Sequence, residues 1–373
     1  MEKYFGESTP KLGFGLMRLP RISEEVPDVE QVKKMVDIFL EAGFTYFDTA
    51  FVYGDSEEVI KQALVDRYPR DKYTLCTKLN AWLGCHDEES AKQEFFKSLE
   101  RTGAGYFDYY LLHALQENNY HLYDDYHIWD FVKEQQAKGL IKHWGFSFHA
   151  SPKLLDKLLT EHPEVDFIQL QLNYADWENP TVASRANYEV ARKHGKSIVV
   201  MEPVKGGALA DPPGGVKELL EKADPNASCA SWAIRYIAGM DGILTVLSGM
   251  SNIEQMQDNV SYMKNFKPMD EKELAVIKQA QDLIHNIESI PCTACHYCVD
   301  GCPQRIPIPN IFAARNRQTV WNQISGGKWN YDNAVKGKGK ASDCIACGQC
   351  EGACPQRINI IERLKECAEV FDK

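Results

Sequence analysis

The feature that most constrains the fold is a regular alternation of short apolar runs with amphipathic helical stretches between residues 12 and 266. We predict eight buried strands, each followed by a helix, over residues 12–19, 45–50, 73–79, 106–113, 143–148, 167–174, 197–204 and 242–249. Strands that alternate with helices form parallel sheets, because each connection crosses back over the sheet. Eight such units in about 250 residues predict a closed (β/α)8 barrel.

An open, doubly wound sheet is the structural alternative, because it shows the same alternation. Its dinucleotide-binding form has a GxGxxG turn after the first strand, and no such turn follows residues 12–19. Beyond the last barrel helix, residues 271–287 predict a helix that leads out of the barrel. We therefore expect a barrel over residues 1–268, a connecting helix over 269–290 and a separate C-terminal domain over 291–373.

The C-terminal domain contains one four-cysteine pattern twice. PCTACHYCVDGCP (291–303) and DCIACGQCEGACP (343–355) both follow C-x2-C-x2-C-x3-C-P, which is the spacing of bacterial two-cluster ferredoxins. In those proteins three cysteines of one run bind a [4Fe–4S] cluster together with the fourth cysteine of the other run. The crossed assignment gives Cys292, Cys295, Cys298 and Cys354 for one cluster, and Cys344, Cys347, Cys350 and Cys302 for the other.

Zinc is the competing metal, but a structural zinc site closes with four ligands, and two identical runs that end in Cys-Pro fit cubane clusters better. The forty-one residues between Cys302 and Cys344 exceed the compact ferredoxin spacing. Helical stretches such as residues 308–318 therefore predict a mainly α-helical, ferredoxin-like domain. We expect the Gly- and Lys-rich segment 321–343 to be an exposed loop. The remaining cysteines are scattered and are expected to be buried, inert thiols: Cys76, Cys85, Cys229 and Cys367.

Ionisable residues close three successive apolar runs of the barrel. Asp48 lies at the end of the second run, Lys78 at the end of the third and His113 at the end of the fourth, while Tyr53 follows in FDTAFVYG. Catalytic groups of (β/α)8 barrels lie at the C-terminal ends of the strands, which meet at one face. We therefore expect these side chains to share one cavity.

With these motifs the chain resembles the aldo-keto reductases, a family of NAD(P)H-dependent carbonyl reductases built on this barrel, from about residue 10 to 266. The resemblance implies a catalytic tetrad of Asp48, Tyr53, Lys78 and His113. Tyr53 would act as the general acid with its ionised form favoured by Lys78, Asp48 would hold Lys78, and His113 would orient the carbonyl. Each residue alone also has a structural interpretation, as a helix cap or a packed core residue, but the set of four favours catalysis.

The resemblance also implies where a nicotinamide cofactor binds. Ser147 and Gln169 would hold the carboxamide, although Phe148 stands where many members of the family have Asn. Met201 takes the position of the aromatic residue that commonly stacks on the ring. The turn SGMSNIEQMQDN (248–259) resembles the adenosine-binding turn of the potassium-channel β-subunit branch. The cofactor candidates are Gly15, Met17, Ser147, Gln169, Met201, Pro203, Val204, Gly206, Ser251, Gln255, Asp258 and Asn259.

The adenosine turn lacks the Lys and Arg residues that often bind the 2′-phosphate, so the cofactor is NADP or NAD. Phe51, Trp82 and Trp177 lie in loops that we expect at the mouth of the pocket, with a purely structural role as the alternative. The net charge of −11 argues against nucleic acid as a partner. The sequence has no apolar segment of signal-peptide or membrane-spanning length, and we expect a cytoplasmic enzyme that acts on a small carbonyl compound or alcohol.

The two halves of the chain predict different electron chemistry. Nicotinamide transfers two electrons together as hydride, whereas a [4Fe–4S] cluster passes single electrons. A flavin could connect the two, but no flavin motif is readable here. In the first hypothesis, the clusters of a carbonyl reductase exchange electrons with a ferredoxin- or flavodoxin-like carrier. In the second, the clusters of the same reductase only brace its fold. A non-enzymatic redox-sensing or docking subunit is the third hypothesis. The complete tetrad favours an enzyme, and two clusters at ferredoxin spacing favour electron exchange.

Overall fold

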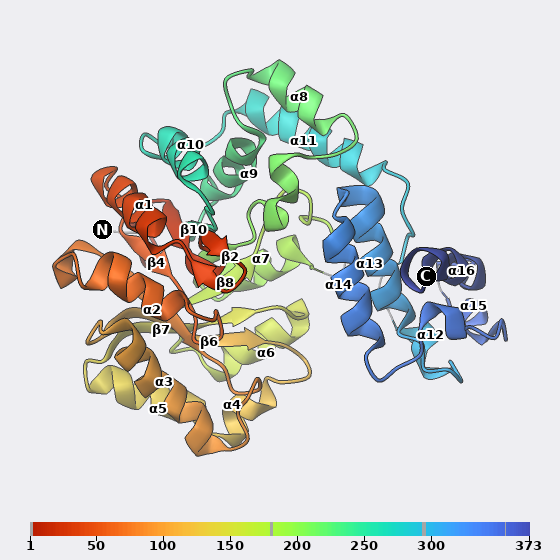
Figure 1. Ribbon diagram of the computed structural model, residues 1–373, viewed down its shortest axis with the longest axis horizontal. Coiled ribbons are helices and arrows are strands. Elements are labelled where there is room, and N and C mark those ends of the chain that lie inside the picture. The colour runs from red at the N-terminus through yellow and green to blue at the C-terminus, as the bar shows by residue number, and fades with distance from the viewer. Residues whose placement is uncertain (1–2, 180–181, 293–295, 355) are drawn as a thin grey trace. The chain divides into compact units, whose positions relative to one another are not determined.

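The computed structural model describes residues 3–179, 182–292, 296–354 and 356–373 (Figure 1). The chain forms two compact units. The first consists of Met1–Leu209 and Asn226–Ile277, and the second of Ala210–Pro225 and Lys278–Lys373. Among the described residues, no helix combines the length and the apolar character that crossing a bilayer requires.

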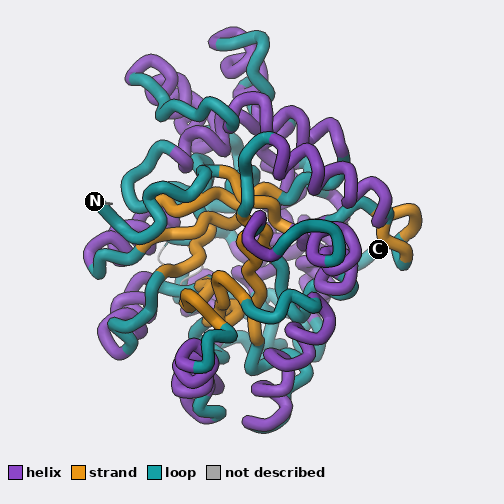
Figure 2. Tube along the Cα trace, turned by 90° about the vertical axis from the view of Figure 1, so that its left-hand side faces the viewer, coloured by secondary structure: helices purple, strands orange, loops and turns teal. Residues whose placement is uncertain are grey.

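The first unit is a closed barrel of eight parallel strands, which confirms the predicted (β/α)8 fold. Figure 2 shows the strands at the centre with helices around them. Each predicted apolar run contributes one strand, and neighbouring strands pair in parallel register, for example Asp48 with both Gly15 and Cys76. In chain order the strands are β1 (Leu12–Gly15), β4 (Tyr46–Asp48), β5 (Thr74–Leu79), β6 (Phe107–Leu115), β7 (Ile141–Phe148), β8 (Phe167–Gln171), β9 (Ser197–Met201) and β10 (Ile243–Ser248).

Helices follow the strands and begin at residues that can cap them. Asp28 accepts a hydrogen bond from the Gln31 N–H at the start of α1 (Val29–Glu41), and Asp87 and Ser90 form a capping box at the start of α3 (Glu88–Thr102). A short hairpin of β2 (Arg21–Ser23) and β3 (Val26–Pro27) was not predicted. The helices of this unit are α1 (Val29–Glu41), α2 (Ser56–Ile60), α3 (Glu88–Thr102), α4 (His121–Asp125), α5 (Ile128–Ala137), α6 (Pro152–Glu161), α7 (Ser184–Lys193), α9 (Cys229–Ala238) and α10 (Ile253–Met263).

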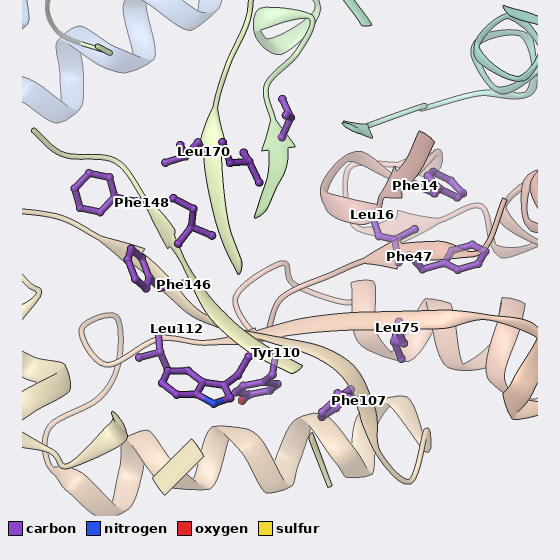
Figure 3. Close-up of a cluster of buried hydrophobic side chains, with 14 of the residues drawn as sticks. Phe14, Leu16, Phe47, Leu75, Phe107, Tyr110, Leu112, Phe146, Phe148 and Leu170 are labelled. Carbon is purple, nitrogen blue, oxygen red and sulfur yellow. The ribbon is translucent and has the colours of Figure 1, made fainter. Parts of the chain in front are cut away.

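Alternate residues of each strand face opposite sides of the barrel wall. One set, which includes Phe47, Leu75 and Tyr110, packs with residues of the surrounding helices (Figure 3). The other set, which includes Tyr46 and Cys76, forms a separate buried cluster made almost entirely of strand residues and therefore lies inside the barrel. Asp48 and Lys78 follow Tyr46 and Cys76 by two residues. They consequently point to the interior at the C-terminal ends of their strands.

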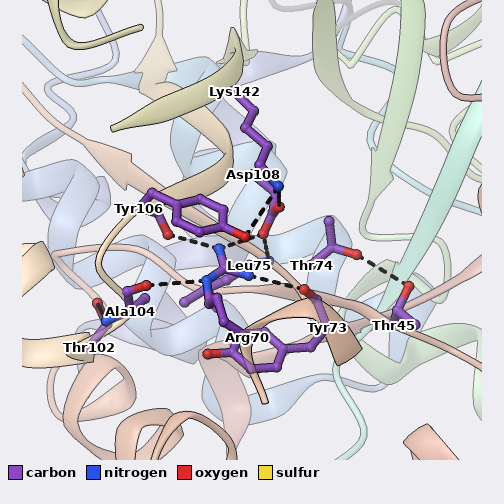
Figure 4. A network of polar contacts seen from close by, with 10 residues as sticks. All are labelled: Thr45, Arg70, Tyr73, Thr74, Leu75, Thr102, Ala104, Tyr106, Asp108 and Lys142. Carbon is purple, nitrogen blue, oxygen red and sulfur yellow. Dashed lines mark hydrogen bonds and ion pairs between the residues drawn. The ribbon is translucent and has the colours of Figure 1, made fainter. Parts of the chain in front are cut away.

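The opposite end of the barrel is held by a network of polar contacts (Figure 4). Asp108 accepts hydrogen bonds from Arg70 at 2.6 Å and from Lys142 at 2.9 Å. Arg70 also donates to the backbone carbonyls of Tyr73, Ala104 and Tyr106. These residues lie near the N-terminal ends of β5, β6 and β7. Polar groups at this end of a (β/α)8 barrel contribute to stability rather than to catalysis.

The second unit is helical, as predicted. Its core contains Ile311 of α13 (Ile308–Trp321), Tyr331 of α14 (Ile324–Val335) and Phe371 of α16 (Ile360–Phe371). The rings of Tyr331 and Phe371 stack with 4.4 Å between centroids. The helices that lie wholly or partly in this unit are α8 (Val216–Ala223), α11 (Glu271–His285), α12 (Tyr297–Asp300), α13 (Ile308–Trp321), α14 (Ile324–Val335), α15 (Gln349–Gly352) and α16 (Ile360–Phe371).

The prediction of a loop over residues 321–343 was wrong, because α14 occupies residues 324–335 of that segment. The prediction relied on the low helix propensity of glycine. The structure gives these glycines another role. A Cβ atom at Gly327 would lie 2.3 Å from Cγ of Gln318 and 2.8 Å from the carbonyl oxygen of Ala314, so glycine permits close packing of α14 against α13. Within this segment, residues 322–323 and the lysine-rich stretch 336–340 are turn and coil.

Candidate active site and cysteine cavities

Asp48 and Lys78 form a buried ion pair at the C-terminal end of the barrel. Lys78 Nζ donates to Asp48 Oδ1 at 2.5 Å and to the Thr49 carbonyl at 2.6 Å. Both side chains are almost fully buried, with 1% and 4% of the surface of Lys78 and Asp48 exposed. Burial alone would lower the pKa of Lys78, but attraction to Asp48 and Tyr53 raises it above its usual value. Lys78 therefore stays charged at neutral pH.

Tyr53 and His113 lie beside this pair. Lys78 Nζ is 5.0 Å from the centre of the Tyr53 ring, and the rings of Tyr53 and His113 meet edge to face with 5.6 Å between centroids. Tyr53 is set by the turn after β4, where its N–H donates to the carbonyl of Ala50 at 3.0 Å. The structure thus brings together four residues that come from the ends of three strands, β4, β5 and β6.

The electrostatics of Tyr53 differ in part from the expectation. Desolvation by the surrounding protein raises the pKa of Tyr53 above its usual value, and the Lys78 ammonium opposes that rise without cancelling it. The attraction to Lys78 is present, but desolvation is the larger effect, which a sequence cannot reveal. The hydroxyl therefore keeps its proton at neutral pH, as a proton donor must.

His113 is a buried, neutral imidazole. The pKa of His113 lies well below its usual value, mainly because the imidazole is buried. Electrostatic repulsion by Lys78 and His149 lowers this pKa further. Among the described residues, Nδ1 of His113 has no hydrogen-bond partner. A neutral imidazole has one N–H donor and one acceptor nitrogen. His113 can therefore donate to a carbonyl oxygen without adding a second cation to the site.

A cavity of about 430 Å³ opens beside Tyr53. Its lining runs from Tyr53 and Asp55 past Met17 and Arg18 to Ser251, so one space contains both a tetrad residue and an adenosine-end candidate. Arg18 was not predicted, because the first strand was expected to extend to residue 19, whereas β1 ends at Gly15 and Arg18 lies in the turn that follows. It lies 3.6 Å from the carboxylate of Glu202 and is half exposed. Its guanidinium is available in this cavity for an anionic ligand.

Two carboxamide candidates lie next to each other on β7 and β8, where Ser147 pairs with Gln169. The Ser147 hydroxyl accepts the N–H of Ala114 at 2.7 Å, which leaves its own proton free to donate. Gln169 is buried, and its Oε1 has no partner among the described residues. An orphaned buried acceptor beside a hydroxyl donor matches the donor and acceptor of a nicotinamide carboxamide.

The remaining cofactor candidates lie at the same end of the barrel. Gly15 ends β1 and Met201 ends β9. Pro203 and Val204 follow in a turn where Glu202 and Gly206 adopt left-handed conformations with φ of 56° and 62°. A Cβ atom at Gly206 would lie 3.4 Å from the Glu202 carboxylate, so this position needs glycine for its backbone angle rather than for space.

At the adenosine end, the structure separates two pairs of candidates. Ser251 and Gln255 lie at the start of α10, where the Ser251 N–H donates to Gln255 Oε1 at 2.8 Å. Asp258 and Asn259 are engaged inside the protein instead. Asp258 accepts the Ser228 hydroxyl at 2.6 Å, and Asn259 donates to the Ser248 hydroxyl at 2.6 Å. These bonds give Asp258 and Asn259 a structural role that the motif alone does not indicate.

Two of the three aromatic residues expected at the mouth contact the backbone of the candidate tetrad. The Trp82 indole N–H donates to the His113 carbonyl at 3.3 Å, and the backbone N–H of Phe51 donates to the Lys78 carbonyl at 3.2 Å. The centre of the Phe51 ring lies 4.3 Å from the guanidinium carbon of Arg101. Trp177 packs against Tyr188 at 5.7 Å and against Tyr236 at 6.2 Å between ring centroids.

The two cysteine runs fold as a structural repeat. Helices α12 and α15 occupy matching positions, and Arg305 and Arg357, which follow the two Cys-Pro pairs, both have φ of 52°. His296 and Gly348, each of which comes directly after the second cysteine of its run, also have positive φ, at 65° and 79°. Such backbone is uncommon outside glycine, and its recurrence at equivalent positions indicates one local fold used twice.

Each set of described thiols lines its own cavity in the second unit. Cys302, Cys344, Cys347 and Cys350 line one, with Ile306, Ile308 and Leu364 among the other residues. Cys292, Cys298 and Cys354 line the other, with Ile308, Phe312 and Ile358. Cys295, the fourth candidate of that set, lies outside the described residues. The thiols are therefore grouped as the crossed assignment requires.

The thiols line cavities that are otherwise mainly apolar. Such a lining suits the thiolate ligands and dry surroundings of an iron–sulfur group. Cys367 lines neither cavity, and burial raises the pKa of its thiol to about 12, as expected for an inert cysteine.

Two family models match successive parts of the chain. Residues 11–282 match the model of the aldo/keto reductase family, and residues 291–359 match a 4Fe-4S dicluster domain. An aldo-keto reductase of Strobilurus tenacellus is 30% identical over 210 residues, which cover 53% of this chain and 59% of that protein. An aldo-keto reductase of Mycolicibacterium smegmatis is 27% identical, covering 56% of this chain and 69% of that protein.

Solved structures show the same fold. The holo form of an aldo-keto reductase from Bacillus halodurans superposes with a TM-score of 0.57 at 25% identity, covering 72% of this chain and 91% of that one. An aldo/keto reductase from Klebsiella pneumoniae, solved in complex with NADP and acetate, gives a TM-score of 0.58 at 20% identity, covering 73% of this chain and 91% of that one.

Proposed function

Because the chain belongs to the aldo/keto reductase family, we propose that it reduces an aldehyde or ketone with NADPH or NADH, or oxidises the corresponding alcohol. The observation that carries the proposal is the convergence of a buried Lys78–Asp48 pair, a protonated Tyr53 and a neutral His113 on one end of the barrel. When bound, reduced nicotinamide supplies a hydride to the carbonyl carbon.

The side chains of this site have distinct roles in the proposed reaction. His113 donates a hydrogen bond to the carbonyl oxygen and orients it toward Tyr53. As the C=O double bond becomes single, Tyr53 gives its proton to the oxygen, and Lys78 stabilises the phenolate that remains until solvent restores the proton. Asp48 keeps Lys78 in place through the 2.5 Å contact. In the oxidative direction the same groups act in reverse.

Groups along the open end of the barrel would hold the cofactor. Gln169 would accept a hydrogen bond from the carboxamide, Ser147 would donate one to it, and Met201 would pack against the nicotinamide ring. Gly15, Met17, Pro203, Val204 and Gly206 would hold the pyrophosphate, and Ser251 and Gln255 would contact the adenosine end. The cavity from Tyr53 to Ser251 supports this path. The NADP in the Klebsiella pneumoniae neighbour favours NADP over NAD, and Arg18 is the nearby cation for its phosphates.

The C-terminal domain is proposed to hold two [4Fe–4S] clusters, one on Cys292, Cys295, Cys298 and Cys354 and the other on Cys344, Cys347, Cys350 and Cys302. Such a group, when bound, accepts and releases single electrons. Cys347 is exposed, and Ile345, two residues before it, is 60% exposed. An electron carrier of the ferredoxin or flavodoxin type could therefore approach the cluster that we propose on Cys344, Cys347, Cys350 and Cys302. The alternatives are clusters that only brace the domain and a non-enzymatic docking subunit.

Turnover of a carbonyl panel tests the enzymatic proposal. The full-length protein, reconstituted anaerobically with iron and sulfide, is mixed with NADPH or NADH and a series of aldehydes, ketones and sugars. We expect oxidation of the nicotinamide with at least one class. If the protein binds NADPH but oxidises it with none of them, the docking-subunit alternative replaces the reductase.

Replacing Cys344 with alanine tests the cluster assignment. Cys344 lines the cavity that also contains Cys302, Cys347 and Cys350, and it does not line the other one. We expect the iron and acid-labile sulfide bound after anaerobic reconstitution to fall by about half, because one of two cubanes loses a ligand. Cys367→Ala is the matched control, since this buried cysteine of the same unit lines neither cavity and should leave the iron content unchanged. Equal iron loss in both variants, or zinc bound in place of iron, would contradict the assignment.

A further inference from the structure

The peptide that joins His113 to Ala114 has an unusual conformation. Ala114 lies inside β6 but has φ of 56°, in the left-handed region. The pairing of β6 with β7 shifts register between Leu112 and Leu115, so the bulge falls on the residues that carry the site histidine. The left-handed region is unfavourable for a non-glycine residue, because Cβ crowds the following carbonyl oxygen. Such a conformation persists only where the surrounding structure holds it.

Three side chains from different parts of the barrel hold this one peptide group. The Tyr123 hydroxyl of α4 donates to the His113 carbonyl at 2.5 Å, and the Trp82 indole donates to the same oxygen at 3.3 Å. On the other side of the peptide, the N–H of Ala114 donates to the Ser147 hydroxyl at 2.7 Å. The side chain of Asn119 also donates to the Ala114 carbonyl at 3.0 Å.

The donors are themselves fixed. Tyr123 is fully buried. Trp82 lies in the turn after β5, where its backbone N–H donates a hydrogen bond to Asn80 Oδ1 at 3.1 Å. Asn80 is held in turn by the buried carboxylate of Glu94 on α3, which accepts its backbone N–H at 2.9 Å and its side-chain amide at 2.6 Å. The His113 carbonyl therefore accepts two hydrogen bonds, from Tyr123 and from Trp82, and each donor is held by different neighbours.

We propose that Tyr123 is a positioning residue, which together with Trp82 holds the His113–Ala114 peptide in its left-handed form and thereby aims the His113 imidazole at the substrate oxygen. Without the Tyr123 hydroxyl, the carbonyl loses its shorter bond and the strained peptide can relax toward the extended conformation of its neighbours. The imidazole would then turn from the position beside Tyr53. The consequence for catalysis rests on the proposed function of His113, whereas the positioning itself does not.

Tyr123→Phe tests the proposal, with Tyr110→Phe as the matched control. Tyr110 is also a fully buried tyrosine, on β6 itself, but its hydroxyl has no partner among the described residues. In the full-length holoprotein with NADPH and p-nitrobenzaldehyde, we expect kcat/KM to fall about tenfold for Tyr123→Phe, as for loss of one strong positioning hydrogen bond. NADPH affinity should not change, and Tyr110→Phe should stay within about twofold of the native enzyme.

Crystal structures of the two variants give a readout that does not depend on turnover. We expect Ala114 to leave the left-handed region, and the His113 ring to move, in Tyr123→Phe but not in Tyr110→Phe. If Ala114 and His113 keep their conformations in both variants, the proposal is overturned, whatever the kinetics. If the native protein reduces no aldehyde, the structures still decide the positioning, and only the proposed function has failed.

Discussion

Tyr53→Phe is expected to lower kcat by about 10²–10⁴, the usual contribution of a positioned proton donor. The substitution removes one hydroxyl and keeps the ring that packs edge to face against His113. Because the hydroxyl acts only when charge develops on the carbonyl oxygen, substrate and cofactor binding should change little. The loss should therefore appear in kcat rather than in KM.

Steady-state kinetics with the best carbonyl of the panel measure this loss, and quenching of nicotinamide fluorescence measures cofactor affinity. Tyr110→Phe again serves as the control, because it removes a hydroxyl from the same barrel outside the site. A Tyr53→Phe enzyme with native kcat would show that another group supplies the proton. A variant that no longer binds NADPH would indicate a role for Tyr53 in the cofactor site instead.

Lys78→Met is expected to lower the free energy of unfolding of the barrel by about 3–5 kcal/mol, besides impairing catalysis. The substitution leaves Asp48 buried without its counter-ion, and breaking one side of a buried pair costs that amount. Lys61→Met is the matched control, since Lys61 also pairs with an aspartate, Asp66, but with 39% and 49% of the two side chains exposed. An exposed pair contributes at most about 1 kcal/mol.

Urea denaturation followed by far-ultraviolet circular dichroism gives both free energies. Removing both charges in Asp48→Asn/Lys78→Met should recover part of the loss, because no unpaired charge then remains. If Lys78→Met is no less stable than Lys61→Met, Asp48 is neutral in the folded protein, and its role in holding a charged Lys78 is contradicted.

The barrel could be predicted from the sequence because its signal is local and repeated. Each buried strand is an apolar run, and the polar residues at or near the C-terminal ends of β4, β5 and β6 mark the face where the strands meet. The residues at which the strands end could be predicted less well. The first run was expected to extend to residue 19, but β1 ends at Gly15, where a 3-10 turn (Leu16–Arg18) brings Met17 and Arg18 to the cavity.

Features that depend on contacts between distant segments could not be predicted. Arg18 meets Glu202, and the hydroxyl of Tyr123 meets the carbonyl of His113, only after the barrel closes. Helix α14 was missed for a related reason, since Gly327 is there for close contact with α13 rather than for flexibility. The desolvation that raises the pKa of Tyr53 is likewise a property of the closed site.

The central claim is direct transfer of hydride from nicotinamide to a carbonyl in the barrel, with the proton supplied by Tyr53. The most direct test uses NADPH in which deuterium replaces both hydrogens at C4 of the nicotinamide ring, with the full-length protein in ordinary water. Our account predicts one deuterium on the carbinol carbon of each product molecule, as mass spectrometry would show. Hydrogen from the solvent at that carbon would contradict it, because the electrons would then have reached the substrate by another route.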